Sequence, residues 1–109
     1  MNLQSAFEQT GGLCWTTVGG FTANATWPFA TISIHAEQIR VVLSVFRLYR
    51  RTFSFTHQTL QAARRRKGFR SGMQFVHNVV DYPALIVFRS PDYPYLAAAV
   101  KAHGYHVED

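Results

Sequence analysis

The sequence predicts a mainly β domain of about seven antiparallel strands, arranged in two near-orthogonal sheets and closed by one C-terminal amphipathic helix. A chain of 109 residues has room for a single hydrophobic core. Apolar and polar residues alternate with the two-residue period of a strand through most of residues 13–89. Nine Phe, five Tyr and two Trp also favour strands. An antiparallel sheet of this size bends on itself, and its open end needs a cover.

The first half of the chain reads as a tail followed by strands. Residues 1–11 are largely polar and run into a Gly-Gly pair, so we expect an N-terminal tail before a domain of residues 12–105. The first strand begins at Leu13 and ends or bulges at Gly19 and Gly20. Two alternating runs, separated by a short polar turn near Glu37, then predict a hairpin.

The middle of the chain continues the strand pattern. Phe53 and Phe55 share the inward face of the next strand. Residues 60–67 contain good helix formers, but both neighbours are strands and the connections are too short for a crossover. We therefore predict an edge strand there, where basic residues discourage pairing between molecules. Residues 73–77 alternate again, and residues 85–88 are apolar on both faces, which predicts a strand buried on both sides.

The last element is a helix. Asp92 is a suitable N-cap, and Pro94 stands in the first turn, where its missing N–H costs nothing. Apolar positions then recur at helical spacing until Gly104, which terminates the helix. We expect this helix to cover the open end of the barrel and residues 106–109 to form a short tail.

Two stretches of the sequence resemble a known group. Residues 24–30, Asn-Ala-Thr-Trp-Pro-Phe-Ala, are similar to a segment that leads into the second strand of small bacterial pleckstrin-homology-like (PH/GRAM-like) proteins. Residues 72–77, the Tyr82-Pro83 pair and a Pro-containing final helix that ends in Gly104-Tyr105 resemble the same group. The resemblance extends over residues 13–105 and implies a PH-like barrel, but no activity, because members of the group are functionally unassigned. Residues 13–39 contain no Lys or Arg, so the inositol-phosphate pocket of many such domains is not expected.

Basic residues are concentrated in the middle of the chain. The net charge is +5, and ten of the eleven basic residues fall within residues 40–89, where Asp81 is the single acid. Such a field attracts nucleic acid, anionic lipid headgroups or an acidic protein surface. The candidate anion-binding residues are Arg47, Arg50, Arg51, Arg64, Arg65, Arg66, Lys67 and Arg70. The alternative interpretation is a solvated surface that keeps the protein in solution.

The sequence does not match the templates of enzymes, cofactor sites or metal sites. It has no Gly-rich phosphate loop, no nucleophile elbow and no paired Cys motif, so we expect no catalytic residues, no cofactor and no metal. His103 and His106, followed by Glu108 and Asp109, are the nearest approach to a metal-ligand group. Cys14 stands alone, and no signal peptide or long apolar run is recognisable, which fits a cytoplasmic protein.

The function that this sequence favours is a protein-interaction module. Such a module would use an exposed sheet edge, or the groove between helix and strand, to bind an extended segment. The alternative is binding of anionic lipid headgroups or nucleic acid through residues 64–70. A homo-oligomer is compatible with the sequence, and an enzyme is the least favoured class.

Overall fold

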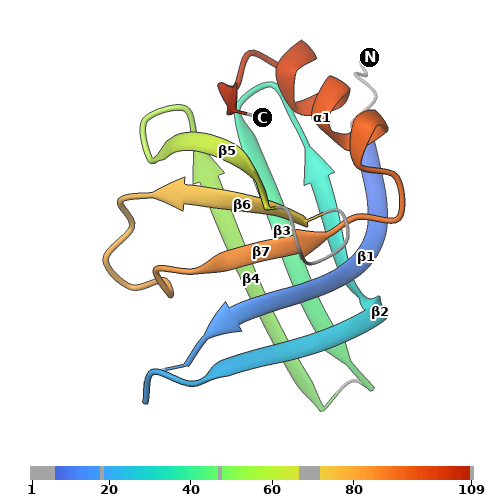
Figure 1. Cartoon of the computed structure of the whole chain (residues 1–109), viewed down its shortest axis with the longest axis vertical. Coiled ribbons are helices and arrows are strands. Elements are labelled where there is room, and N and C mark those ends of the chain that lie inside the picture. The colour runs from blue at the N-terminus through green and yellow to red at the C-terminus, as the bar shows by residue number, and fades with distance from the viewer. Residues whose placement is uncertain (1–6, 18, 47, 67–71, 109) are drawn as a thin grey trace.

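The computed structural model describes residues 7–17, 19–46, 48–66 and 72–108 (Figure 1). These residues form a curved sheet of strands with one helix at its end. In chain order the elements are β1 (Phe7–Thr16), β2 (Thr22–Ile34), β3 (Gln38–Val45), β4 (Tyr49–Thr56), β5 (Leu60–Arg66), β6 (Gly72–His77), β7 (Ile86–Arg89), α1 (Tyr93–Ala102) and β8 (Val107–Glu108). The mainly β prediction with one C-terminal helix is therefore confirmed.

The strands form one open sheet, and the expected closed barrel of two sheets is not found. The strand order is β4-β3-β2-β1-β7-β6-β5-β8, so β4 and β8 are the two edges. β1 and β2 pair on both sides of a bulge near Gly11. Between the pairs Gly11–Ala30 and Leu13–Ala25, β2 has more residues than β1. A bulge of this kind interrupts the pairing locally and bends the strand, and the ladder resumes on its other side. Gly11 is needed at this point, since a Cβ there would collide with the carbonyl oxygen of Arg89.

The hydrophobic core lies between the two halves of the curved sheet. In Figure 1, β3 and β4 run in a different direction from β5, β6 and β7. Phe55 of β4 stacks on Phe75 of β6 with ring centroids 5.3 Å apart, so the two halves face each other. The inward face predicted for Phe53 and Phe55 is confirmed, because both are fully buried, as are Ile39 and Val41 of β3.

The helix covers one end of the sheet, as Figure 1 shows. The Asp92 side chain accepts a hydrogen bond from the Tyr95 N–H at 3.3 Å, which caps the first turn as predicted. Leu96 and Val100 are buried against the core. Gly104 has a φ of +89°, a conformation that glycine adopts without strain, and the chain leaves the helix there.

Several boundaries differ from the expected ones. The expected tail of residues 1–11 overlaps β1, because Phe7 already pairs with Ile34. The expected tail of residues 106–109 contains β8, which pairs in parallel with β5. The strand predicted over residues 60–67 is confirmed as β5, although β8 lies beside part of it. Residues 24–30 lie inside β2 rather than before it, and Trp27 is exposed.

No helix among the described residues has the length and apolar character needed to cross a membrane.

Candidate functional site

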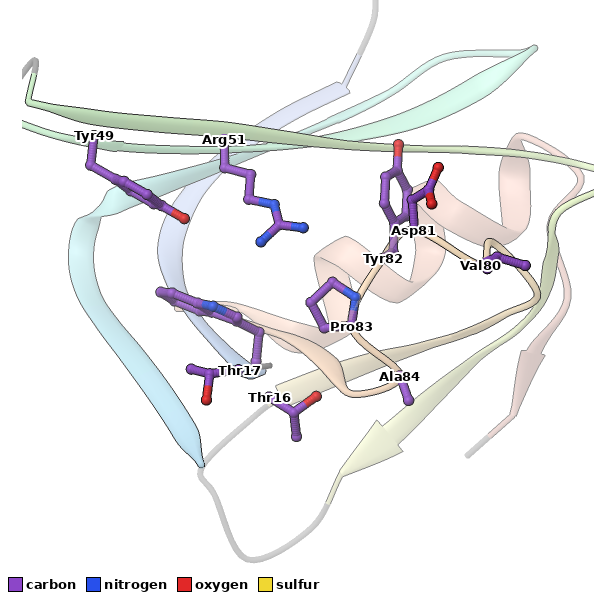
Figure 2. A pocket seen from close by; sticks show the side chains of 10 residues that line it. Thr16, Thr17, Tyr49, Arg51, Val80, Asp81, Tyr82, Pro83 and Ala84 are labelled. Carbon is purple, nitrogen blue, oxygen red and sulfur yellow. The ribbon is translucent and has the colours of Figure 1, made fainter. Parts of the chain in front are cut away.

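A hollow of about 450 Å³ lies where β1 ends, β4 begins and the β6–β7 connection passes (Figure 2). Its volume falls within the range of roughly 300–1,000 Å³ that is typical of small-molecule and cofactor sites. The hollow is lined by Trp15, Thr16, Thr17, Tyr49, Arg51, Val80, Asp81, Tyr82, Pro83 and Ala84. Figure 2 shows Tyr49 and Arg51 pointing from β4 towards the loop that carries Tyr82 and Pro83.

Strand alternation explains why Arg51 reaches this hollow. In β4 the side chains of Phe53 and Phe55 face the core, and Arg51 stands two residues earlier on the same face. The core ends there, so the guanidinium lies against the last core ring: its Cζ is 4.8 Å from the centroid of Phe53. This is a cation–π contact, and it leaves Arg51 half-buried beside the hollow.

Tyr82 fastens the β6–β7 connection to the edge of the sheet. Its hydroxyl accepts a hydrogen bond from the backbone N–H of Ser54 in β4 at 3.0 Å. Its ring packs edge-on against Phe53 and Phe55, with centroids 5.1 and 5.7 Å away. Tyr82 therefore closes one side of the hollow and ties it to the core.

His77 at the end of β6 forms two hydrogen bonds with the same connection. The Val79 N–H donates to Nδ1 of His77 at 3.0 Å, so this nitrogen is the acceptor. Nε2 of the neutral ring then carries the proton, which it donates to the carbonyl oxygen of Pro83 at 2.8 Å. With both ring nitrogens engaged within the loop, His77 has a structural role.

The chemistry of the hollow suits binding. Its lining offers three aromatic rings, from Trp15, Tyr49 and Tyr82, together with one guanidinium and one carboxylate. Aromatic rings pack against flat or apolar groups, and a guanidinium forms paired hydrogen bonds with a carboxylate or phosphate. Among the lining residues Asp81 is the single carboxylate, and no His or Cys accompanies it as a partner for general acid–base or nucleophilic chemistry.

The described members of the predicted basic clusters lie in different surroundings. Arg50 is exposed on the outer face of β4, opposite the face that carries Arg51. In β5, Arg64 forms an ion pair with Glu108 at 2.9 Å. Arg65 lies over the ring of Tyr93 at 4.7 Å, and Arg66 donates a hydrogen bond to Gln74 at 3.1 Å. Arg47, Lys67 and Arg70 lie outside the described residues.

The structure thus brings Arg51 alone, of the described candidate residues, into the hollow. The sequence did not identify Trp15, Tyr49 or Tyr82 as site residues. Tyr49 could have been found, because it continues the inward alternation of Arg51 and Phe53. Tyr82 could not, since its position depends on a loop that folds back over β4.

Two ionisable groups away from the hollow have shifted pKa values. The hydrogen bond from Arg64 lowers the pKa of Glu108, and the same bond links β8 to β5. Burial, followed by the charge of Glu37, raises the pKa of Tyr105. The Tyr105 hydroxyl donates to the carbonyl oxygen of His35 at 3.0 Å, and its ring stacks on His57. Both groups secure the chain after α1.

Metal ligands are not grouped in the part of the chain that the structure describes, because no three His, Cys, Asp or Glu side chains come together there. The comparisons with known proteins give no match: no family model matches the chain, and neither does any curated protein or solved structure.

Proposed function

We propose that this chain is a non-enzymatic binding module with a PH-like fold, and that it binds a segment of a partner protein at the hollow beside β4. The observation that carries this proposal is a half-buried arginine that lines the same hollow as three aromatic side chains, at the end of a sheet. Trp, Tyr and Arg are the residues that contribute most often to the energy of protein interfaces. Seven strands followed by one helix also support the PH-like assignment.

Exposed apolar residues beside the hollow support a macromolecular partner. Val80, which lines the hollow, is 94% exposed, and Leu48, which precedes Tyr49, is 88% exposed. Phe46, in the same turn between β3 and β4, is 74% exposed and packs edge-on against Phe29, with ring centroids 5.1 Å apart. Exposed apolar side chains that lie together are typical of interaction surfaces. A partner segment that enters the hollow would bury Val80.

A selection experiment tests this proposal. Random displayed peptides of about eight residues, long enough for one strand, would be selected on the full chain. Trp27→Phe leaves Trp15 as the single tryptophan, so its emission reports events in the hollow. We expect selected peptides to change Trp15 emission and to lose about tenfold or more in affinity when Arg51 is replaced by Ala.

Arg65→Ala is the matched control, because Arg65 also lies over an aromatic ring, at 4.7 Å from Tyr93 compared with 4.8 Å for Arg51 over Phe53. It should leave peptide affinity unchanged. Selection that enriches no peptide, or equal losses for Arg51→Ala and Arg65→Ala, would contradict the proposal.

Binding of anionic lipid or nucleic acid through residues 64–70 is the second candidate. Arg64 and Arg65 are exposed, which supports it, although each also has a partner within the chain. Sedimentation with phosphatidylserine vesicles and gel shifts with single-stranded RNA test it at low salt, where charge attraction is strongest. On this candidate, Arg64→Glu with Arg65→Glu should abolish binding, and Arg51→Ala should not.

A further inference from the structure

The β4 edge of the sheet is open along part of its length. β4 pairs with β3 in unbroken antiparallel register from Gln38–Thr56 to Val45–Tyr49. In such a pair, alternate residues direct both N–H and C=O towards the partner strand, and the residues between them direct both away. Ser54 and Thr56 belong to the second set, because their N–H groups donate to the Tyr82 hydroxyl and to Oγ1 of Thr59.

Arg50 and Thr52 share that phase with Ser54, so their backbone groups also face away from β3. Both residues are exposed. Among the described strands β4 has β3 as its single neighbour, and no described strand covers this stretch. The edge is therefore sealed from Ser54 onwards by side chains and open over residues 49–52.

The open stretch lies beside the hollow. Tyr49 and Arg51 line the hollow from β4, and Tyr82 both lines it and occupies the edge at Ser54. A strand added to residues 49–52 would thus end at Tyr82. Side chains of a strand alternate between its two faces, so every second side chain of the added strand would face the side of Arg51 and the hollow.

We propose that residues 49–52 of β4 accept an extended acidic segment of a partner protein as an added strand, with one carboxylate bound by Arg51 in the hollow. This inference rests on the proposed function and names its binding mode and the charge of its partner. Backbone pairing of this kind supplies affinity, and alternate side chains supply specificity.

Charge explains why the partner is acidic. Arg51 faces the hollow, where Asp81 is the one carboxylate among the lining residues, and Arg50 faces the outer side of β4, so both faces of an added strand meet an arginine. The outer face near Arg50 also carries Arg40, with Glu8 as the acid in that shallow depression. Opposite charges on neighbouring strands stabilise their pairing, and like charges weaken it.

The same charges disfavour a second copy of this chain as the occupant. Two β4 edges paired about a twofold axis would bring Arg50 and Arg51 of each copy close to those of the other. Like charges opposite one another are unfavourable, and basic residues at an edge discourage edge-to-edge association. The partner chain is therefore a different sequence.

Synthetic peptides of about eight residues test the inference on the full chain. One series alternates Val and Glu, a second alternates Val and Lys, and displayed libraries with fixed Glu or fixed Lys cover other sequences. We expect Glu peptides to bind about tenfold or more tightly than their Lys counterparts. N-methylation at alternate residues then blocks one edge of the peptide at a time. Methylation in one phase should abolish binding, and methylation in the other should preserve it.

A pair of protein variants tests the same edge. Thr52→Pro removes an N–H that faces away from β3, a position where an edge strand tolerates proline. Thr52→Val is the matched control, because it keeps the N–H. Thr52→Pro should lower peptide affinity about tenfold, and Thr52→Val should not. The N-methylated peptides give an answer even if Thr52→Pro does not fold.

The outcomes separate the two proposals. Equal binding by both N-methyl phases, with loss on Arg51→Ala, would overturn strand addition and leave the hollow as the binding site. Lys peptides that bind as well as Glu peptides would overturn the acidic partner. Libraries that enrich no peptide, or wild-type protein that binds anionic vesicles through Arg50 and Arg51 instead, would overturn both. Self-association that Thr52→Pro abolishes would assign the edge to a second copy.

Discussion

The two edges of the sheet are protected by different means. The β8 edge is a strand of two residues that pairs in parallel with β5, where the Ala63 N–H donates to the carbonyl oxygen of His106 at 2.8 Å. The Arg64–Glu108 ion pair adds charge there. Short strands and charged side chains are common ways to prevent edge pairing. The β4 edge is eight residues long and is sealed by single hydrogen bonds at Ser54 and Thr56.

This difference shows that only part of the sheet edge is open to pairing with another strand. The β8 edge is short and carries an ion pair, and the β4 edge is open over residues 49–52 beside an aromatic hollow. Substitutions in the core, in the helix and at each edge can separate these contributions.

Substitutions in the core between the two halves of the sheet should destabilise the protein most. Phe55 of β4 is fully buried and stacks on Phe75 of β6, so Phe55→Ala leaves a cavity between the two halves of the sheet. We expect a loss of about 3–5 kcal/mol in the free energy of unfolding, measured by denaturant titration. Phe46→Ala is the control, because Phe46 is 74% exposed. Equal losses would mean that the strand faces are assigned incorrectly.

Substitution of a buried residue of α1 should have the next largest effect on stability. Leu96 is fully buried against the core and Ala98 is exposed, two residues along the same helix. Leu96→Ala should cost about 2–5 kcal/mol, and Ala98→Ser should cost only a few tenths because it changes helix propensity alone. Thermal or chemical denaturation measures both. Similar costs would contradict the packing of α1 over the end of the sheet.

Removing one hydroxyl should lengthen the open part of the β4 edge. Tyr82→Phe keeps the ring against Phe53 but frees the Ser54 N–H. We expect a loss of about 1 kcal/mol and faster hydrogen exchange at the Ser54 amide. Tyr95→Phe, at an exposed tyrosine of α1, is the control and should change neither quantity. Unchanged exchange at Ser54 would show that Tyr82 does not seal the edge.

The ion pair at the β8 edge should have the smallest effect on stability, and this effect should depend on pH. Because Arg64 lowers the pKa of Glu108 below 4.5, the ion pair contributes stability above that pH and loses it as pH falls through the lowered value. Both groups are well exposed, so Glu108→Gln should lower Tm only slightly at pH 7. The difference between the two proteins should vanish in acid. A difference that grows as pH falls would contradict this.

Much of the fold could be predicted because it depends on local periodicity. Alternation identified the buried faces of β3 and β4, and Asp92, Pro94 and Gly104 identified the helix with its ends. The number of sheets could not be predicted in the same way. Near Gly11 the pairing of β1 with β2 could either end, which would give two sheets, or continue past a bulge, which gives one. The alternation of side chains along the sequence is nearly the same in both cases.

The candidate site was predicted less well because charge along a sequence says little about which groups meet in space. Arg51 was identified among the basic residues, and the structure places it in the hollow. Arg64, Arg65 and Arg66 are consecutive, but a strand directs neighbours to opposite faces. Alternation separates Arg65, which meets Tyr93, from Arg64 and Arg66, which share the other face and meet Glu108 and Gln74.

Local sequence patterns specify which side chains enter the core, where the helix begins and ends, and where positive charge is concentrated, because these properties depend on a few neighbouring residues. Tertiary structure decided that the sheet is continuous and where its edge is open. Tyr82 reaches Ser54 across 28 residues of chain, and Glu108 reaches Arg64 across 44. Contacts at such separation depend on how the whole sheet curves, and no local pattern in the sequence specifies that curvature.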